Sequence, residues 1–232
     1  MGVNAMPEIK KWAMEVRMSF QKTGMAKFIS HLDTVRCITR AMKRANVPVW
    51  FTEGFNPHAF LTFAMPLSLG FESLYETVDF RLMEEVVLNE LAERLNKALP
   101  VDITVKEIYV YETSPNDIRW AEYKIIFNNP DDLLLAQAEK ILSADEIIVL
   151  KKAKKGRNKV EKEVNIKEHI KSFELENDNG KLVLKTVLSS GTSININPML
   201  LIGALTKDTE TDEQDVDIVK VQSYTENMEV FR

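Results

Sequence analysis

Residues 16–48 read VRMSFQKTGMAKFISHLDTVRCITRAMKRANVP, a strand pattern followed by a helix pattern. Apolar and polar residues alternate through 15–20, which is typical of a strand with one buried face. Ser30, followed by Asp33 three residues later, indicates a helix start, because a serine hydroxyl can accept a hydrogen bond from the first helical turn. Apolar residues then recur at helical spacing until Pro48, which cannot continue a helix.

The same two patterns alternate along the rest of the chain. Strand patterns lie at 15–20, 49–52, 60–65, 77–82 and 103–111, with helix patterns at 30–46 and 86–99. After the linker-like stretch 113–117, strand patterns recur at 123–127, 146–150, 182–188 and 218–224, with helix patterns at 131–142 and 198–205. The second half has the order β, α, β, β, α, β of a ferredoxin-like domain, and the first half has the same order with one strand pattern more. We therefore predict an α+β protein with two tandem ferredoxin-like sandwiches, one at 12–112 and one at 118–232.

Composition limits the chemistry that the chain can support. The net charge of −5 argues against indiscriminate coating of nucleic acid. Cys37 is the one cysteine, so the chain lacks the ligands for an iron–sulfur cluster, and three scattered histidines do not suggest a metal site. No apolar run approaches the roughly 20 residues that span a bilayer. The predicted location is the cytoplasm, with no membrane partner.

Basic residues cluster on the first helix of this acidic chain. Four of them follow the spacing i, i+4, i+7, i+8 and therefore share one helix face: Arg36, Arg40, Lys43 and Arg44. Guanidinium groups in a row can bind phosphate or carboxylate oxygens with two hydrogen bonds each. The alternative is an ordinary solvated helix face.

A second candidate site joins that helix to the turn GFNPH at 54–58. Pro57 fixes the turn, and a ferredoxin-like fold could bring His31 and His58 to the same end of the sheet. The predicted pocket comprises Lys22, His31, Asp33, Glu53, Asn56 and His58. This prediction requires the cationic helix and the turn to converge. Otherwise the two histidines only cap a helix and satisfy a turn carbonyl.

The run KKAKKGRNK at 151–159 contains no acid and reads as a flexible basic loop. Its candidate RNA-binding residues are Lys151, Lys152, Lys154, Lys155 and Arg157. Such a loop contacts RNA backbone or an acidic partner, or is simply solvated.

Several fixed spacings recur between residues 20 and 80. They are Phe20/Lys22/Gly24, Ser30–Asp33, Arg40–Ala45, Gly54–His58, Pro66–Gly70 and Glu76/Asp79. With them the first half closely resembles the radical-SAM-linked family, a domain of unknown function, whereas in the second half only Asn197-Pro198 looks familiar. Members of that family are fused to, or encoded beside, a radical S-adenosylmethionine protein. The resemblance thus implies a partner that carries the iron–sulfur cluster and S-adenosylmethionine, with no cofactor bound by this chain.

Three functional hypotheses follow, the first of which is favoured. The chain is an accessory, substrate-presenting partner of a radical S-adenosylmethionine enzyme that binds RNA or phosphate through the basic helix face. A second hypothesis is an RNA-modifying enzyme of pseudouridine-synthase-like architecture, although the loop GFNPHAF lacks the aspartate that such enzymes need. A third is a structural adaptor. The sequence contains no complete catalytic set, so it leans away from an enzyme.

Overall fold

The computed structural model describes residues 12–155 and 158–232 and has the predicted α+β class. The first half contains β1 (Met14–Lys22), η1 (Gly24–Phe28), α1 (His31–Arg44), β2 (Leu61–Phe63), β3 (Glu72–Leu82), α2 (Leu88–Ala98) and β4 (Ile103–Tyr109). The second half contains β5 (Trp120–Phe127), α3 (Leu134–Ser143), β6 (Ile148–Lys155), β7 (Asn158–Asn165), β8 (Ile170–Asp178), β9 (Lys181–Ser189), α4 (Pro198–Thr206) and β10 (Val216–Tyr224).

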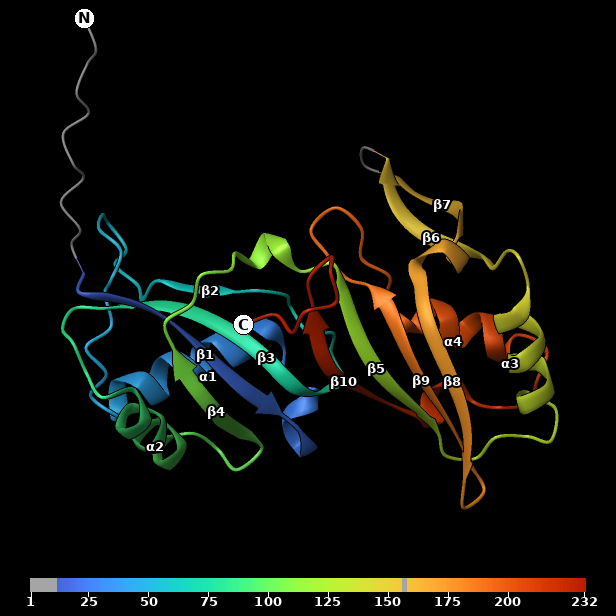
Figure 1. The fold of residues 1–232 in the computed structure, drawn as a ribbon, viewed down its shortest axis with the longest axis horizontal. Coiled ribbons are helices and arrows are strands. Elements are labelled where there is room, and N and C mark those ends of the chain that lie inside the picture. The colour runs from blue at the N-terminus through green and yellow to red at the C-terminus, as the bar shows by residue number, and fades with distance from the viewer. Residues whose placement is uncertain (1–11, 156–157) are drawn as a thin grey trace, which may run out of the picture.

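One sheet runs through both halves in the order β4-β1-β3-β10-β5-β9-β8, with β2 beside β3 (Figure 1). Each half has the same neighbour order: β4-β1-β3-β2 in the first and β10-β5-β9-β8 in the second. All neighbours within a half are antiparallel. The halves meet where β10 pairs with the start of β3 in parallel through Val219↔Glu72 and Lys220↔Ser73. We call this junction the seam.

The hydrophobic core is divided into two clusters, one in each half. In the first, α1 and α2 cover the sheet, and the alternating residues of β1 are buried as predicted, with Val16 and Met18 at 0% exposure. In the second, α3 and α4 pack against β5, β9 and β10. Leu67 and Phe71 precede β3 in the first half and yet pack into the second cluster. No helix in the described part of the chain is both long and apolar enough to cross a membrane.

Two of the predicted elements are wrong. Residues 49–52 form isolated bridges, Val49↔Leu82 and Phe51↔Ala59, where we expected a continuous strand. The basic stretch 151–159 was expected to be a flexible loop, but its described residues, 151–155 and 158–159, belong to β6 and β7, which pair as a separate two-stranded sheet between α3 and β8. The alternating pattern of β7 supplies the pairing strand that makes this sheet possible.

Candidate functional site

A groove of about 600 Å³ lies between α1 and the end of α2. It is lined by Asp33, Arg36, Cys37, Arg40, Arg44, Ala98, Leu99 and Pro100. The three arginines are four residues apart, so each lies about one turn above the last on the same face of α1. Three residues of the predicted basic face, Arg36, Arg40 and Arg44, therefore form one wall of this groove. Lys43 is not among the residues that line it.

Local sequence signals place α1 so that the arginines face outward. The predicted helix start is confirmed, because Ser30 Oγ accepts a hydrogen bond from the Asp33 backbone N–H at 3.1 Å. The buried face differs in part from our expectation. Of the apolar residues that recur at helical spacing in this helix, Ile38 and Met42 are buried, but Leu32 is 57% exposed.

Two arginines stabilise the helix ends at the groove. Arg44 Nη2 donates a hydrogen bond to the carbonyl of Ala98 at 2.6 Å, at the C-terminus of α2. Arg94 of α2 donates to the carbonyls of Ala45 and Asn46 at the C-terminus of α1, the latter at 2.7 Å. Cations favour helix C-termini, where the last carbonyls have no helical partner. Each helix is thus capped by an arginine of the other.

The other two arginines of the groove wall, Arg36 and Arg40, make fewer contacts within the protein than Arg44 does. Arg36 Nη1 lies 3.1 Å from Asp33 Oδ1, and both side chains are more than half exposed, so this pair contributes little to stability. Hydrogen bonds from Ser30 and Arg36 lower the pKa of Asp33. Arg40 makes no hydrogen bond or ion pair with any described residue. Its guanidinium is available to a ligand.

A second hollow of about 420 Å³ continues the groove along the helix ends. It is lined by Arg44, Ala45, Asn46, Arg94, Lys97 and Ala98. Burial raises the pKa of the Cys37 thiol in the first hollow, so this thiol stays protonated near neutral pH. The combined surface offers five cationic side chains and one carboxylate. It is suited to holding an extended polyanion and offers no activated nucleophile.

The predicted pocket is divided between opposite ends of the first half. Lys22 and His31 do come together, because both line a small cavity with Glu76 near the seam. Asp33 lies further along α1 and lines the groove. Glu53, Asn56 and His58 lie elsewhere. The expectation that the turn 54–58 brings His58 into one pocket with His31 is wrong.

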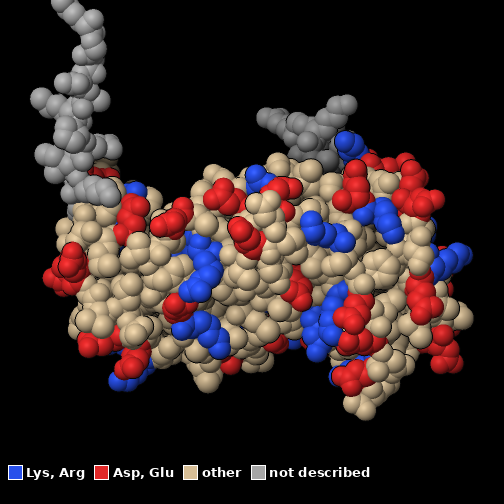
Figure 2. All heavy atoms as spheres, viewed as in Figure 1, with Lys and Arg blue, Asp and Glu red and all other residues tan. Residues whose placement is uncertain are grey.

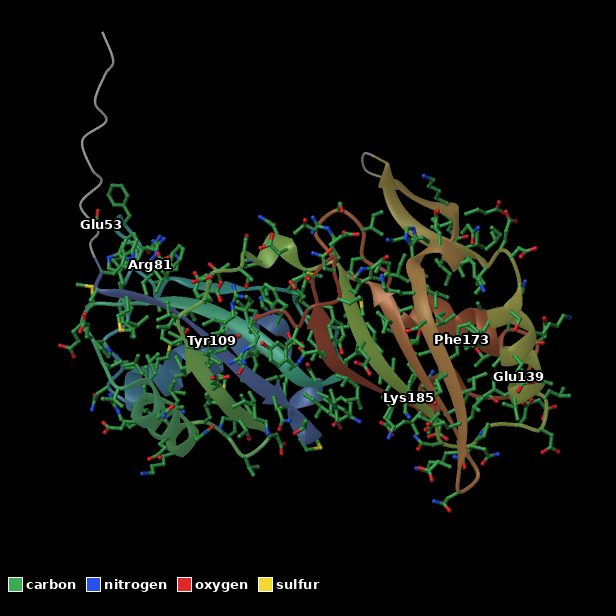
Figure 3. The ribbon with its side chains drawn as sticks, viewed as in Figure 1. Glu53, Arg81, Tyr109, Glu139, Phe173 and Lys185 are labelled. Carbon is green, nitrogen blue, oxygen red and sulfur yellow. The ribbon has the colours of Figure 1, made fainter. Side chains whose placement is uncertain are left out.

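His31 and the turn are separated because the chain that follows α1 reaches β3 at a different point from the cavity that contains His31. The turn begins beside the outer end of β3, where Trp50 N–H donates to the carbonyl of Arg81 at 2.8 Å. The cavity that contains His31 lies at Glu76, five residues earlier on the same strand and therefore about 17 Å away. Figure 3 shows Glu53 and Arg81 at this outer end, far from the second half.

His58 has the ordinary role of a turn residue. Its Nδ1 lies 3.1 Å from Thr52 Oγ1 and 3.0 Å from the carbonyl oxygen of Asn56. His31 packs edge-on against Phe63, with ring centroids 5.0 Å apart. Among the described residues, no group of three or more His, Cys, Asp or Glu is placed to hold a metal ion.

The basic residues of β6 lie near acidic residues and a backbone carbonyl. Lys151, Lys152, Lys154 and Lys155 belong to β6, whereas Arg157 lies outside the described residues. Lys151 Nζ donates to the carbonyl of Asn195 at 3.2 Å. Glu161 and Glu163 of β7 stand opposite residues of β6 in the register. On the face shown in Figure 2, basic and acidic side chains are likewise interspersed over the second half.

Sequence reasoning missed the α2 side of the groove and the charges at the seam. Arg94 and Lys97 lie three residues apart on α2, a spacing that could have revealed a shared helix face. Lys220 interrupts the apolar alternation of β10, and such an interruption is a signal for a buried charge. Neither signal indicates which partner the residue meets.

Two solved structures are similar to this chain at a low level. One is from a Cbf5-Nop10-Gar1 complex, with a TM-score of 0.47 and 10% identity, covering 95% of this chain and 55% of that chain. This chain therefore spans about half the length of that one. The other is an unknown protein from Galdieria sulphuraria, with a TM-score of 0.26 and 14% identity, covering 88% of this chain and 95% of that chain. Neither likeness bears on fold or function at these scores.

No curated protein matches the chain. A family model does match, and it extends over more than three quarters of the sequence, from β1 to the start of α4. The chain belongs to the family described as an uncharacterized protein conserved in bacteria (DUF2344), matched over residues 15–198.

Proposed function

We propose that this chain is an accessory, substrate-presenting partner of a radical S-adenosylmethionine enzyme and that it holds RNA by its phosphates in the α1–α2 groove. The observation that carries the RNA role is the row of Arg36, Arg40 and Arg44 along one wall of that groove. Arginine binds phosphate oxygens with two parallel hydrogen bonds and keeps its charge at any physiological pH.

The association with a radical S-adenosylmethionine enzyme rests on the resemblance of residues 20–80 to the radical-SAM-linked family. In this proposal the iron–sulfur cluster and S-adenosylmethionine are carried by the partner, and both proteins act in the cytoplasm. We also infer that each half is a ferredoxin-like unit, an interpretation supported by the repeated neighbour order and the antiparallel directions within each half.

The RNA role is tested with two charge reversals on α1. Arg36→Glu with Arg40→Glu changes the groove without touching the Arg44 cap. We expect RNA affinity at low salt to fall by about tenfold or more, since each charge-assisted hydrogen bond contributes about 1.5–3 kcal/mol. The slope of log affinity against log salt should decrease by about 0.7 for each phosphate of single-stranded RNA that the variant no longer neutralises. Filter retention over a range of salt concentrations measures both quantities.

Lys43→Glu is the control, because it makes half of the double variant's charge change, on the same helix but outside the groove. A loss of binding free energy in the control that is half of the loss in the double variant would mean that only net charge matters. If the RNA affinity of the double variant equals that of the parent protein, the RNA proposal is wrong.

The partner is tested by capturing the tagged chain from cytosol after ribonuclease treatment. We expect a radical S-adenosylmethionine protein to copurify, and its absence would remove this part of the proposal. Recovery of that protein with no RNA affinity would favour the adaptor role.

A further inference from the structure

A buried ion pair joins the two halves at the seam. Glu76 of β3 receives a hydrogen bond from Lys220 Nζ of β10 at 3.0 Å, and both side chains are only 5% exposed. The same oxygen, Glu76 Oε1, also accepts a hydrogen bond from Ser73 Oγ at 2.8 Å. A buried pair of this kind is tolerated when its geometry is good and its remaining donors are satisfied.

A third buried charge, Lys22, makes the cluster unbalanced. Lys22 is 2% exposed, and its pKa is lowered by burial, with Glu76 opposing that shift. Charged residues lining the two cavities at the seam are Lys22, Lys220 and Glu76. Two ammonium groups therefore share one carboxylate. An excess positive charge in a buried region is costly unless an anion joins it.

Hydrogen-bond counting leads to the same conclusion. An ammonium group has three donors. Within the described residues, Lys22 Nζ donates to the carbonyl of Ile29 at 3.1 Å and Lys220 Nζ donates to Glu76, one bond each. Most donors of both ammonium groups thus lack a protein acceptor, although both side chains are almost fully buried.

Small cavities lie on both sides of this cluster. The one beside Lys220 has a volume of about 40 Å³ and is also lined by Tyr123, Ser190 and Asn197. The one beside Lys22 has a volume of about 10 Å³ and includes His31 and Glu76. A water molecule needs about 10–15 Å³ of space open to its centre, so the larger cavity has room for a small polar group.

The segment 64–70, AMPLSLG, covers both cavities. Its residues Met65 and Leu67 line each of them. Few backbone hydrogen bonds hold it, including Ala64 N–H to Thr77 O at 3.3 Å and Gly70 N–H to Lys27 O at 2.8 Å. A ligand larger than its acidic group would lie beneath this segment and displace part of it.

We propose that the seam is a second binding site, which takes the carboxylate of a small molecule in the cavity beside Lys220, within the charge cluster that also holds Glu76 and Lys22. A carboxylate offers two acceptor oxygens and one negative charge, which match the unused donors and balance the excess charge. Ser190 and Tyr123 supply hydroxyl groups at the same wall. This site is separate from the groove and does not depend on the RNA role.

The test titrates acetate into the full chain against chloride at constant ionic strength, following the lysine ε-methylene NMR signals. We expect saturable shifts of the Lys22 and Lys220 signals. Lys220→Met should weaken the response at Lys22 by about tenfold or more, as loss of one charge-assisted hydrogen bond predicts. Circular dichroism verifies that this variant folds, with the Ser73 hydroxyl left as the hydrogen-bond donor to Glu76. If it does not fold, Lys22→Met with the Lys220 signal gives the same test.

Arg40→Gln is the matched control, since it removes a groove cation and leaves the seam intact. It should keep the full acetate response. An acetate response that is absent, or that persists in both lysine variants, overturns the proposal. Stronger saturable shifts with inorganic phosphate than with acetate would overturn the carboxylate assignment. Loss of RNA binding in the groove variants would leave these outcomes unchanged, so the two proposals fail separately.

Discussion

Arg17 illustrates how distant residues can reverse a local pattern. Its position in the alternation of β1 predicts a solvent-facing side chain, yet it is 0% exposed. Its Nε and Nη2 donate to the two carboxylate oxygens of Asp79 at 2.6 and 2.8 Å. The rings of Tyr111 and Phe231 lie 4.3 and 4.2 Å from its guanidinium carbon. Sequence could not reveal this, because Asp79 is 62 residues away and Phe231 is next to the last residue of the chain.

Asp79→Ala should lower the free energy of unfolding by about 3–5 kcal/mol, because it leaves a buried guanidinium without its carboxylate. Urea denaturation measures the loss. Combining Arg17→Met with Asp79→Leu removes both charges and should cost less than Asp79→Ala alone. A double variant that is less stable than the single one would contradict this account.

At the scale of elements, local signals predicted α1 well and the site only in part. Ser30 and Pro48 lie close to its two ends, so the helix and its arginine row follow from spacing alone. The α2 wall of the groove could not be predicted, because it depends on how two helices pack. The convergence of His31 and His58 was wrong for a similar reason. To place His58 relative to His31, one must know in which direction residues 49–63 run along β3. Sequence periodicity does not contain that information.

Ser30→Ala should destabilise the protein by about 1 kcal/mol, because the Asp33 N–H loses its acceptor. Chemical denaturation at neutral pH provides the measurement. Ser30→Asn is the matched control, since asparagine caps helices about as well as serine. If both substitutions cost the same, the hydroxyl is not the stabilising feature.

At the scale of the whole molecule, the sequence suggested two units and held no sign of their shared sheet. The halves are connected by β3 and β10 and by polar contacts such as Lys27 Nζ to Asp217 Oδ1 at 3.0 Å. Hydrogen bonds from Asn128 and then Lys27 lower the pKa of Asp217. These contacts join residues up to 190 positions apart, beyond the range of any local pattern.

Asp217→Asn should therefore reduce stability at neutral pH and have progressively less effect in acid. The folded carboxyl has a pKa below its unfolded value of 3.8, so its contribution is complete above that value and is lost as the pH falls through the folded pKa. Because Asp217 is 47% exposed, we expect a loss below about 1 kcal/mol. Unfolding midpoints from pH 7 down to acid, compared with Asp208→Asn in an exposed loop, test this. A difference that stays constant with pH would contradict it.

The return of residues 231 and 232 to the first half affects how the protein is made. Thr113 Oγ1 hydrogen-bonds to the carbonyl of Arg232, 119 residues later, and Phe231 packs on Arg17. At a synthesis rate of about 5–20 residues per second, the ribosome needs roughly 6–24 s to add this intervening length. During that interval the nascent first half has all its own strands and still lacks the cover over Arg17. The first half can therefore close over Arg17 only after the second half has been synthesised.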